Sequence, residues 1–533
     1  MRKIRRYTQK TTTAFVQANY WRPELTVDFW RHHSESRPDA LAVADERVAY
    51  TWAESVRMID AIAHGLIAAG VPQDHVLLIQ APNSALYVLL RLACEEAGII
   101  PAFLPLGFRR SEIQAIAKKL NPVGAIIETS GKHNLLALYR TLKSELCFSH
   151  LFSMETTTTQ IPSIANLVRT PTPAPQSSRS VRPYNMTGIV TSSGTTGFPK
   201  CIEYSCWPRL ASGRVYIERL KITDCDTILT CIPFYTGGGD MQFHTAPQVG
   251  ASFLVQSHFS PGATCSWIAR ERITGAVMVP TMIARITALP NLNEYDFSSL
   301  RWVVSGGGML QYDIGARFED ATGAKIIQGY GLMDCGAIAS HRIDDPREIR
   351  LRSNGLLIPG VELRVLDEKG CRVPQGTIGE ICVNGPHCNG DYIGDRDGVQ
   401  IAWRGGFFHT GDLGRITDDG YVIIEGRSKD IIIRGGQNIS VHEVLTILCR
   451  HPAILDATLV RMPDPELGER ACAFVVLRPG GTLDFAKMVA FMKSCDIADY
   501  KIPERLEIIP EFPMTAGGNK IDKYALEAKL RKI

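Results

Sequence analysis

The sequence has no C-x-x-C pair among its 14 cysteines. Zinc-binding domains usually space cysteines in such pairs, so no zinc site is expected. The basic start, Met1–Arg6, is not followed by an apolar run, so it does not read as a secretory signal. We therefore expect free thiols in a cytoplasmic protein.

The chain also lacks an excess of charge of one sign and a long apolar run. Lys and Arg number 58 and Asp and Glu 55, so nothing indicates a nucleic-acid or membrane-surface partner. The most apolar stretch, residues 86–106, is broken by Arg91, Glu95 and Pro101, so no membrane span is expected. A length of 533 residues predicts two or more domains.

Helix and strand patterns alternate over the first 130 residues. Residues 75–80, 99–106 and 124–128 have the pattern of buried strands, and residues 84–97 and 111–120 that of helices. Strands joined by helices of this length predict an α/β fold with parallel-rich sheets covered on both faces.

The pattern changes near Gly426. A helix pattern at 441–450 is followed by apolar runs at 457–462 and 471–477, with a turn expected at 463–465. These elements predict a separate α+β unit of about a hundred residues.

One loop has the composition of a phosphate-binding loop. Residues 191–200, TSSGTTGFPK, combine small hydroxyl residues, two glycines and a lysine, which supply close backbone approach, hydrogen bonds and charge. It is not a Walker loop, because G-x-x-x-x-G-K-[ST] is absent. Composition alone leaves a polar surface loop equally open.

The whole ten-residue string resembles the phosphate-loop signature of the adenylate-forming superfamily. That superfamily holds acyl- and aryl-CoA synthetases, adenylation domains of peptide synthetases, and luciferases. The resemblance implies ATP and Mg²⁺, and ATP-binding roles for Ser192, Ser193, Gly194, Thr195, Thr196, Gly197 and Lys200.

Two glycine-containing segments resemble further superfamily motifs in the required order. The segment at 305–308 resembles the turn beside the adenine and the acyl pocket. The segment at 328–334 resembles Y-G-x-T-E, which implies that Tyr330 stacks on adenine and Asp334 holds the magnesium ion. Met333 stands where threonine is usual. The implied nucleotide-binding residues are Gly307, Gly329, Tyr330, Gly331 and Met333, and Gly306 and Gly308 belong to the acyl pocket.

Later segments complete the resemblance. Residues 407–413 resemble the T-G-D motif, so Asp412 is expected to accept hydrogen bonds from the ribose. Residues 426–430 resemble the domain hinge, with Arg427 at the ribose and Lys429 as the pivot. Residues 431–440 resemble the loop beside the pantetheine tunnel, which implicates Gly435 and Gly436.

The segment at 513–523 resembles P-x-T-x-x-G-K, which delivers the catalytic lysine. Lys520 is the expected catalytic residue, although Asn519 is inserted before it. The matches run from about residue 25 to 530. They imply an N-terminal adenylation domain over 1–428 and a mobile C-terminal lid domain over 429–533.

The segments that bear on the subfamily disagree. Residues 106–113 and 344–351 look most like aryl-acid AMP ligases, which load siderophore carrier proteins. Residues 233–239 instead resemble the P-x-x-H-x-x-G segment of CoA ligases, and make Tyr235, Thr236 and Gly237 acyl-pocket candidates. Thr236 replaces the histidine, and the three glycines are expected to leave room for an aryl or cyclic acid.

Residues 431–469 look more like CoA ligases, so the resemblance favours an acid–thiol ligase whose thiol is that of CoA. The first alternative is an aryl-acid AMP ligase that loads the phosphopantetheine of a carrier protein in siderophore or natural-product biosynthesis. A non-catalytic binding protein is a second alternative, because Met333, Asp334 and the shifted Lys520 depart from the motifs. Nothing in the sequence indicates the added oxygenase reaction of a luciferase.

Overall fold

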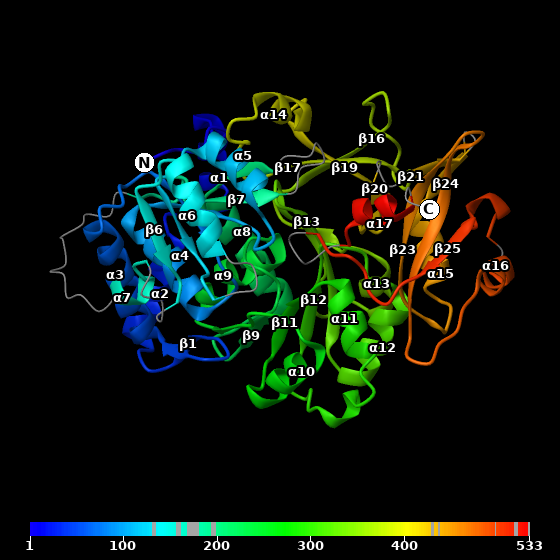
Figure 1. The fold of residues 1–533 in the computed structure, drawn as a ribbon, viewed down its shortest axis with the longest axis horizontal. Helices are drawn as coiled ribbons and strands as arrows, with labels where there is room; N and C mark the ends of the chain where they lie inside the picture. Colours follow the sequence, from blue (N-terminus) through cyan, green and yellow to red (C-terminus); the bar gives the residue numbers. More distant parts are fainter. Residues whose placement is uncertain are drawn as a thin grey trace.

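A large α/β domain and a smaller C-terminal α+β domain form the protein, as the computed structural model in Figure 1 shows. The structure describes residues 1–130, 135–155, 161–167, 181–192, 199–427, 431–434, 437–495, 497–515 and 521–530. The expected fold class is confirmed. The domain boundary proposed at 428/429 lies outside the described residues.

The first sheet of the large domain has six strands, parallel except at one edge. In spatial order they are β6 (His150–Ser153), β5 (Gly124–Ile127), β3 (Val76–Gln80), β4 (Ile100–Phe103), β7 (Gly188–Ser192) and β8 (Lys200–Tyr204), and only β8 is antiparallel. The phosphate-loop segment joins β7 to β8, so it leaves the carboxyl end of a parallel strand, where such sheets bind ligands.

The second sheet has nine strands with a parallel centre. In spatial order they are β15 (Leu356–Leu357), β14 (Gly336–Ser340), β13 (Lys325–Leu332), β12 (Trp302–Ser305), β11 (Gly275–Met278), β9 (Thr227–Thr230), β10 (Ser252–Val255), β1 (Leu41–Ala44) and β2 (Ala49–Thr51). Strands β12 and β13 are parallel neighbours, with Ser305 paired to Gln328. The two glycine motifs at 305–308 and 328–334 therefore leave the same edge of the sheet.

Helices cover these sheets, and their ends follow from local sequence. In α3 the Thr51 hydroxyl accepts a hydrogen bond from the Glu54 N–H, while the Glu54 side chain accepts one from the Thr51 N–H. The helices of the large domain are α1 (Gln9–Gln17), α2 (Thr26–Ser36), α3 (Trp52–Ala68), α4 (Ala85–Ala97), α5 (Arg110–Leu120), α6 (Leu135–Glu145), α7 (Ile164–Leu167), α8 (Cys206–Leu220), α9 (Gly237–Val249), α10 (Pro261–Arg270), α11 (Pro280–Thr287), the short 3₁₀ helix Leu292–Glu294, α12 (Tyr312–Thr322), α13 (Arg347–Arg352) and α14 (Arg396–Ala402).

A third, antiparallel sheet completes the large domain. It comprises β16 (Glu362–Leu366), β17 (Gly379–Asn384), β19 (Phe407–Ile416), β18 (Trp403–Arg404) and β20 (Val422–Arg427), where β20 pairs with β19. The pairing of β17 with β19 is irregular, because Glu380 opposes Leu413 while Cys382 opposes His409. The extra residues of β19 include Gly411, which has a φ of 70°. This bulge lies in the T-G-D segment.

The C-terminal domain packs helices on a mixed sheet, drawn orange to red in Figure 1. The strands are β22 (Gln437–Ser440), β21 (Ile431–Arg434), β24 (Gly468–Leu477), β23 (Ile454–Asp464) and β25 (Arg505–Ile508), and the helices are α15 (Val441–Leu448), α16 (Phe485–Ser494), the 3₁₀ helix Asp499–Lys501 and α17 (Lys523–Leu530). The turn expected at 463–465 is corrected: β23 continues through Asp464, which pairs with Gly468. Ladder pairing with β24 extends the strand past Pro463, and the turn begins at Pro465.

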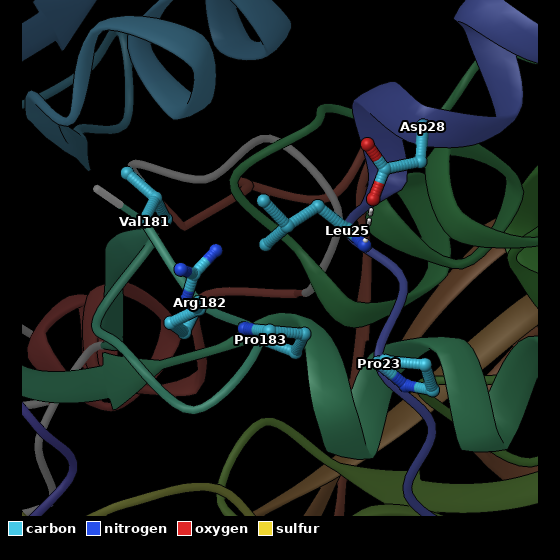
Figure 2. Close-up of a pocket in the computed structure, with 6 residues that line it drawn as sticks. All are labelled: Pro23, Leu25, Asp28, Val181, Arg182 and Pro183. Atoms are coloured by element: carbon cyan, nitrogen blue, oxygen red, sulfur yellow. Dashed lines mark hydrogen bonds between the residues drawn. The ribbon is translucent and has the colours of Figure 1, made fainter. Parts of the chain in front are cut away.

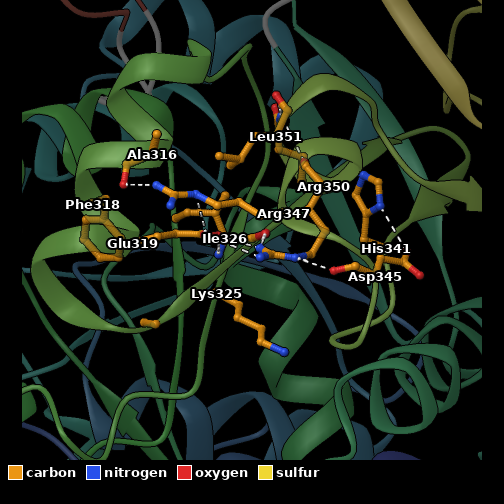
Figure 3. Close-up of polar contacts among 12 residues, drawn as sticks. Ala316, Phe318, Glu319, Lys325, Ile326, His341, Asp345, Arg347, Arg350 and Leu351 are labelled. Atoms are coloured by element: carbon orange, nitrogen blue, oxygen red, sulfur yellow. Dashed lines mark hydrogen bonds and ion pairs between the residues drawn. The ribbon is translucent and has the colours of Figure 1, made fainter.

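The segment at 344–351, which looked like a subfamily signature, supports strand β13. The buried Arg350 guanidinium donates to Glu319 Oε1 at 2.5 Å and to the Ile326 carbonyl at 2.6 Å (Figure 3). Its Nε donates to the Asp345 carbonyl at 2.9 Å. These bonds fix α12 and α13 against the start of β13, whose far end carries Tyr330.

Among the described residues, no helix is both long and apolar enough to cross a membrane. All 14 cysteines have free thiols, and nine of them, among them Cys94, Cys201 and Cys382, are buried.

Candidate functional site

Tyr330, Asp412 and Arg427 form one polar cluster. The Tyr330 hydroxyl donates to Asp412 Oδ2 at 2.7 Å, and Arg427 Nε donates to Asp412 Oδ1 at 2.8 Å. Tyr330 and Asp412 are buried, whereas the Arg427 side chain is 44% exposed. Burial and the Asp412 charge raise the pKa of Tyr330 well above its usual value, so the phenol stays protonated and acts as a donor.

Each oxygen of Asp412 still has a free lone pair after these two bonds, because a carboxylate oxygen can accept twice. The arrangement therefore leaves acceptor capacity for a diol such as ribose. Tyr330 and Arg427 are 97 positions apart in sequence (427 minus 330), yet the structure brings both to Asp412. The resemblance assigned all three residues to one nucleotide.

Lys200, Tyr392 and Asp334 form a second polar cluster. Lys200 Nζ donates to the Tyr392 hydroxyl at 3.0 Å, and that hydroxyl donates to Asp334 Oδ1 at 2.5 Å. Lys200 also lies 4.3 Å from the centre of the Tyr392 ring. Burial and the Asp334 charge raise the pKa of Tyr392, so its hydroxyl proton stays in place. The phosphate-loop lysine and the predicted metal residue are thus joined through one tyrosine.

Asp334 fits a role as a ligand of Mg²⁺. Only one of its oxygens carries the Tyr392 bond, and the residue is half-buried, so lone pairs remain for a hard cation. Its side chain is held at the turn between β13 and β14.

The glycine motifs provide exposed backbone at the ends of two parallel strands. Gly307, with a φ of 78°, and Gly308 are exposed after β12. A Cβ at Gly306 would lie 3.7 Å from the Gly329 carbonyl oxygen, so these motifs are in contact. Gly331 is needed for the hairpin itself, because a Cβ there would approach the Gly336 carbonyl oxygen to 2.5 Å.

The acyl-pocket segment lies beside the same hairpin. Thr236 caps α9, its hydroxyl accepting from the Gly239 N–H at 3.3 Å, and Tyr235 is buried. A Cβ at Gly237 would lie 3.2 Å from Met333 Sδ. Met333, which replaces the usual threonine, therefore borders the acyl-pocket candidate.

The sequence predicted that the three glycines at 237–239 leave room for the acid, and the structure corrects this prediction. A Cβ at Gly239 would lie 2.3 Å from the Pro233 carbonyl oxygen, so this glycine permits close packing of α9 and opens no space. At Gly238 the side chain of Ile232 would be 3.1 Å away. Of the three, only Gly237 is exposed.

A buried ionic network fixes the start of α9. Arg91 Nη2 donates to Asp240 Oδ1 at 2.5 Å, and the Tyr204 hydroxyl donates to the other oxygen of Asp240. Removal of one partner from such a buried pair is strongly destabilising, because the other charge is left uncompensated.

Sequence reasoning missed two residues of the site, Tyr392 and Asn389. Asn389 Nδ2 donates to the Met333 carbonyl, and its N–H donates to the Asp334 carbonyl at 3.0 Å. Both residues are buried and lie between the recognised motifs. Their residue types carry no spacing signal, and only the folded chain shows that they hold the Met333–Asp334 turn.

Several predicted site residues lie outside the described residues. These are Ser193, Gly194, Thr195, Thr196, Gly197, Lys429, Gly435, Gly436 and Lys520. Ser192 is described as the last residue of β7, without its side chain. The roles assigned to all of these stay predictions.

A separate surface pocket lies elsewhere. Pro23, Leu25, Asp28, Val181, Arg182 and Pro183 line it, and the Leu25 N–H donates to Asp28 Oδ2 at 2.8 Å (Figure 2). Among the predicted site residues that the structure describes, none lines this pocket.

Two family models match the chain. The model of the AMP-binding enzyme family covers residues 30–393, and that of the AMP-binding enzyme C-terminal domain covers residues 443–519.

Relatives match over nearly the whole length. A medium-chain fatty-acid–CoA ligase of Escherichia coli (strain K12) is 28% identical over 99% of this chain and 94% of that protein. A salicylyl-CoA synthase / salicylate adenylyltransferase of Streptomyces sp. is 28% identical over 97% of this chain and 95% of that protein.

The crystal structure of an anthranilate CoA ligase in complex with anthranoyl-AMP is similar in fold. It superposes with a TM-score of 0.87 at 23% identity, and the match covers 96% of this chain and 97% of the other.

Proposed function

The chain belongs to the AMP-binding enzyme family, and we propose that it activates a carboxylic acid with ATP and passes the acyl group to the thiol of CoA. The observation that carries this proposal is the meeting of four motif segments at the β13–β14 hairpin. Tyr330 and Asp334 belong to that hairpin region. Asp412 accepts from Tyr330 and from Arg427, Lys200 reaches Asp334 through Tyr392, and Gly237 borders Met333.

In the first half-reaction, a carboxylate oxygen of the acid forms a bond to the α-phosphorus of ATP. The bond from that phosphorus to the bridging oxygen breaks, and pyrophosphate leaves. Asp412 accepts from the ribose hydroxyls, the Tyr330 ring faces the adenine, and Lys200 draws the phosphates toward β8. Negative charge that grows on the phosphate oxygens is stabilised by fixed cations, which is the role we assign to Lys520. A Mg²⁺ ion at Asp334 would add positive charge at the same oxygens.

In the second half-reaction, the thiol sulfur attacks the acyl carbon of the adenylate. The bond from that carbon to the phosphate oxygen breaks, AMP leaves, and the thiol proton passes to solvent. We propose that the domain over 429–533 pivots at Lys429 between the two steps, which withdraws Lys520 and brings Gly435 and Gly436 to the thiol.

We propose an aryl or cyclic acid as the substrate. The names of two similar proteins support this choice, because one acts on salicylate and the other on anthranilate. Gly237 is exposed, and the neighbouring Met333 has an unbranched, adaptable side chain, so this part of the pocket can accommodate a ring.

The test is acid-dependent exchange of radiolabelled pyrophosphate into ATP. Benzoate, salicylate, anthranilate, cyclohexanecarboxylate and medium-chain fatty acids form the panel, and a reaction without acid is the control. Exchange with at least one acid is expected. An absence of exchange with every acid, from protein that binds ATP, would favour the non-catalytic binding protein.

The acceptor is tested on the acids that give exchange. Free CoA should give an acyl-CoA thioester at a rate near that of exchange. The alternative, an aryl-acid AMP ligase, is favoured by the sequence segments at 106–113 and 344–351. It predicts a thioester on a phosphopantetheinylated carrier protein and little product with free CoA.

A further inference from the structure

Three potential metal ligands lie on one face of the third sheet, outside the residues assigned to ATP and acid. Glu380 and Cys382 are two positions apart on β17, so their side chains point to the same face. His409 on β19 is the direct cross-strand partner of Cys382. The bulge in β19 changes the register between these pairs and places Glu380 near His409 as well.

The three side chains converge on a single nitrogen. His409 Nδ1 lies 2.9 Å from Glu380 Oε2 and 3.3 Å from Cys382 Sγ. Arg404 Nη2 lies 2.9 Å from the same nitrogen. A neutral imidazole nitrogen has either one proton or one lone pair, so it can donate toward Glu380 and Cys382 or accept from Arg404, but not both. Hydrogen bonds alone therefore cannot satisfy all the groups of this cluster at once.

A cation would resolve this convergence. The carboxylate oxygen, the sulfur and the imidazole nitrogen all lie within 4.8 Å of one another. A tetrahedral zinc ion with usual bond lengths separates neighbouring ligand atoms by roughly 3.3–3.6 Å. The observed separations of 2.9 and 3.3 Å need only small side-chain adjustments to reach that range.

The charges and the surroundings also suit a divalent cation. A thiolate and a carboxylate together carry two negative charges, which a dication neutralises. The Gly411 N–H donates to Glu380 Oε1 at 3.2 Å, so the second oxygen of that carboxylate is already oriented. Arg404, whose side chain is 57% exposed, supplies the positive charge in the present arrangement and is free to turn outward.

We propose that Glu380, Cys382 and His409 bind one Zn²⁺ ion, with water in a fourth position. On binding, a sulfur–zinc bond forms, and the thiol proton passes to solvent. The lack of C-x-x-C spacing predicted no zinc site. That spacing rule detects ligands that lie close together in one loop, whereas two strands supply the ligands proposed here.

Co²⁺ provides the most direct probe, because a cysteine thiolate bound to it gives a charge-transfer band in the near ultraviolet. Full-length protein without a histidine tag is stripped with a chelator and titrated with Co²⁺, and Zn²⁺ is then added as a competitor. One equivalent of Co²⁺ per chain should produce the band, and Zn²⁺ should remove it.

Variants separate a built site from chance binding. Cys382→Ala and His409→Ala should each weaken cation binding by roughly tenfold or more. Cys371→Ala, which removes an exposed cysteine, is the matched control and should keep the band.

Arg404→Ala is a second probe that is expected to fold normally, because it changes an exposed residue and leaves all three ligands intact. It should tighten Zn²⁺ binding, since a competing positive charge is removed. A wild-type protein without the thiolate band, or a band that persists in Cys382→Ala, would overturn the proposal and leave a hydrogen-bonded cluster only.

Discussion

Tyr392 donates its hydroxyl proton to Asp334 across 2.5 Å and accepts from Lys200 across 3.0 Å. This one hydroxyl couples the lysine of the predicted phosphate loop to the carboxylate proposed to hold magnesium. It lies on a segment that none of the recognised motifs includes.

Replacement of Tyr392 by phenylalanine tests this coupling. Without the hydroxyl, Asp334 and Lys200 lose a charge-assisted hydrogen bond of about 1.5–3 kcal/mol. We expect kcat/KM for ATP in the exchange reaction to fall by roughly tenfold or more, with a higher Mg²⁺ concentration needed for half-maximal rate. Tyr421→Phe, in a ring that stacks on His341 away from the site, is the control. An unchanged Mg²⁺ dependence in Tyr392→Phe would contradict the coupling.

Asp412 is expected to recognise the ribose. Asp412→Ala should lower kcat/KM for exchange by roughly a hundredfold, because two hydrogen bonds to a buried carboxylate are lost. The more specific readout compares ATP with 3′-deoxy-ATP. Wild-type protein should prefer ATP, and Asp412→Ala should lose most of that preference. Asp419→Ala, at an exposed turn, should retain it.

The inserted Asn519 leaves the identity of the catalytic lysine to experiment. Lys520→Ala should abolish most pyrophosphate exchange but leave thioester formation from a chemically prepared acyl-adenylate nearly unchanged. Lys523→Ala is the matched variant, three positions away at the start of α17. The reverse pattern would assign the catalytic role to Lys523.

Gly237 and Met333 are expected to limit the size of the acid. The methyl group of Gly237→Ala would lie 3.2 Å from Met333 Sδ, so the variant should lose activity with bulky aryl acids more than with small acids, by roughly tenfold. The double variant Gly237→Ala with Met333→Ala should recover the larger acids. If size preference does not change in either variant, this glycine does not border the acid.

Stability should depend on pH through His387. This imidazole is buried, its Nδ1 lies 3.1 Å from Ser212 Oγ, and its Nε2 lies 2.9 Å from the Pro359 carbonyl oxygen. Burial lowers the pKa of His387 from 6.5 to about 4, so the folded protein favours the neutral ring. In the unfolded chain the ring gains a proton below about pH 6.5.

The contribution of His387 is therefore complete above pH 6.5 and is lost as pH falls from 6.5 toward 4, by roughly 3 kcal/mol. Thermal unfolding of wild type and His387→Gln between pH 4 and 8 measures it. The difference in melting temperature between the two proteins should change across that window. Carboxylates that titrate there are common to both proteins, so this change reports on His387. A constant difference would show that His387 does not titrate as the structure indicates.

Local sequence predicted much of the fold. The strand expected at 124–128 appears as β5, and the helices expected at 84–97 and 441–450 appear as α4 and α15, each within two residues at its ends. These elements follow from apolar periodicity and from caps, which depend on neighbours a few positions apart. The turn expected at 463–465 lies two residues later, at 465–467, because the hairpin ladder with β24 extends the strand through Asp464.

The amino-acid sequence by itself determined which elements form and which motifs the chain carries, because both depend on residues close together along the chain. Only the tertiary structure decided that Tyr392 joins Lys200 to Asp334, that Gly239 packs against Pro233 and opens no space, and that Glu380, Cys382 and His409 meet on one sheet face. The physical reason is that side-chain hydrogen bonds and cation sites act over about 3 Å of space, and strand register, bulges and crossovers set which distant residues come that close.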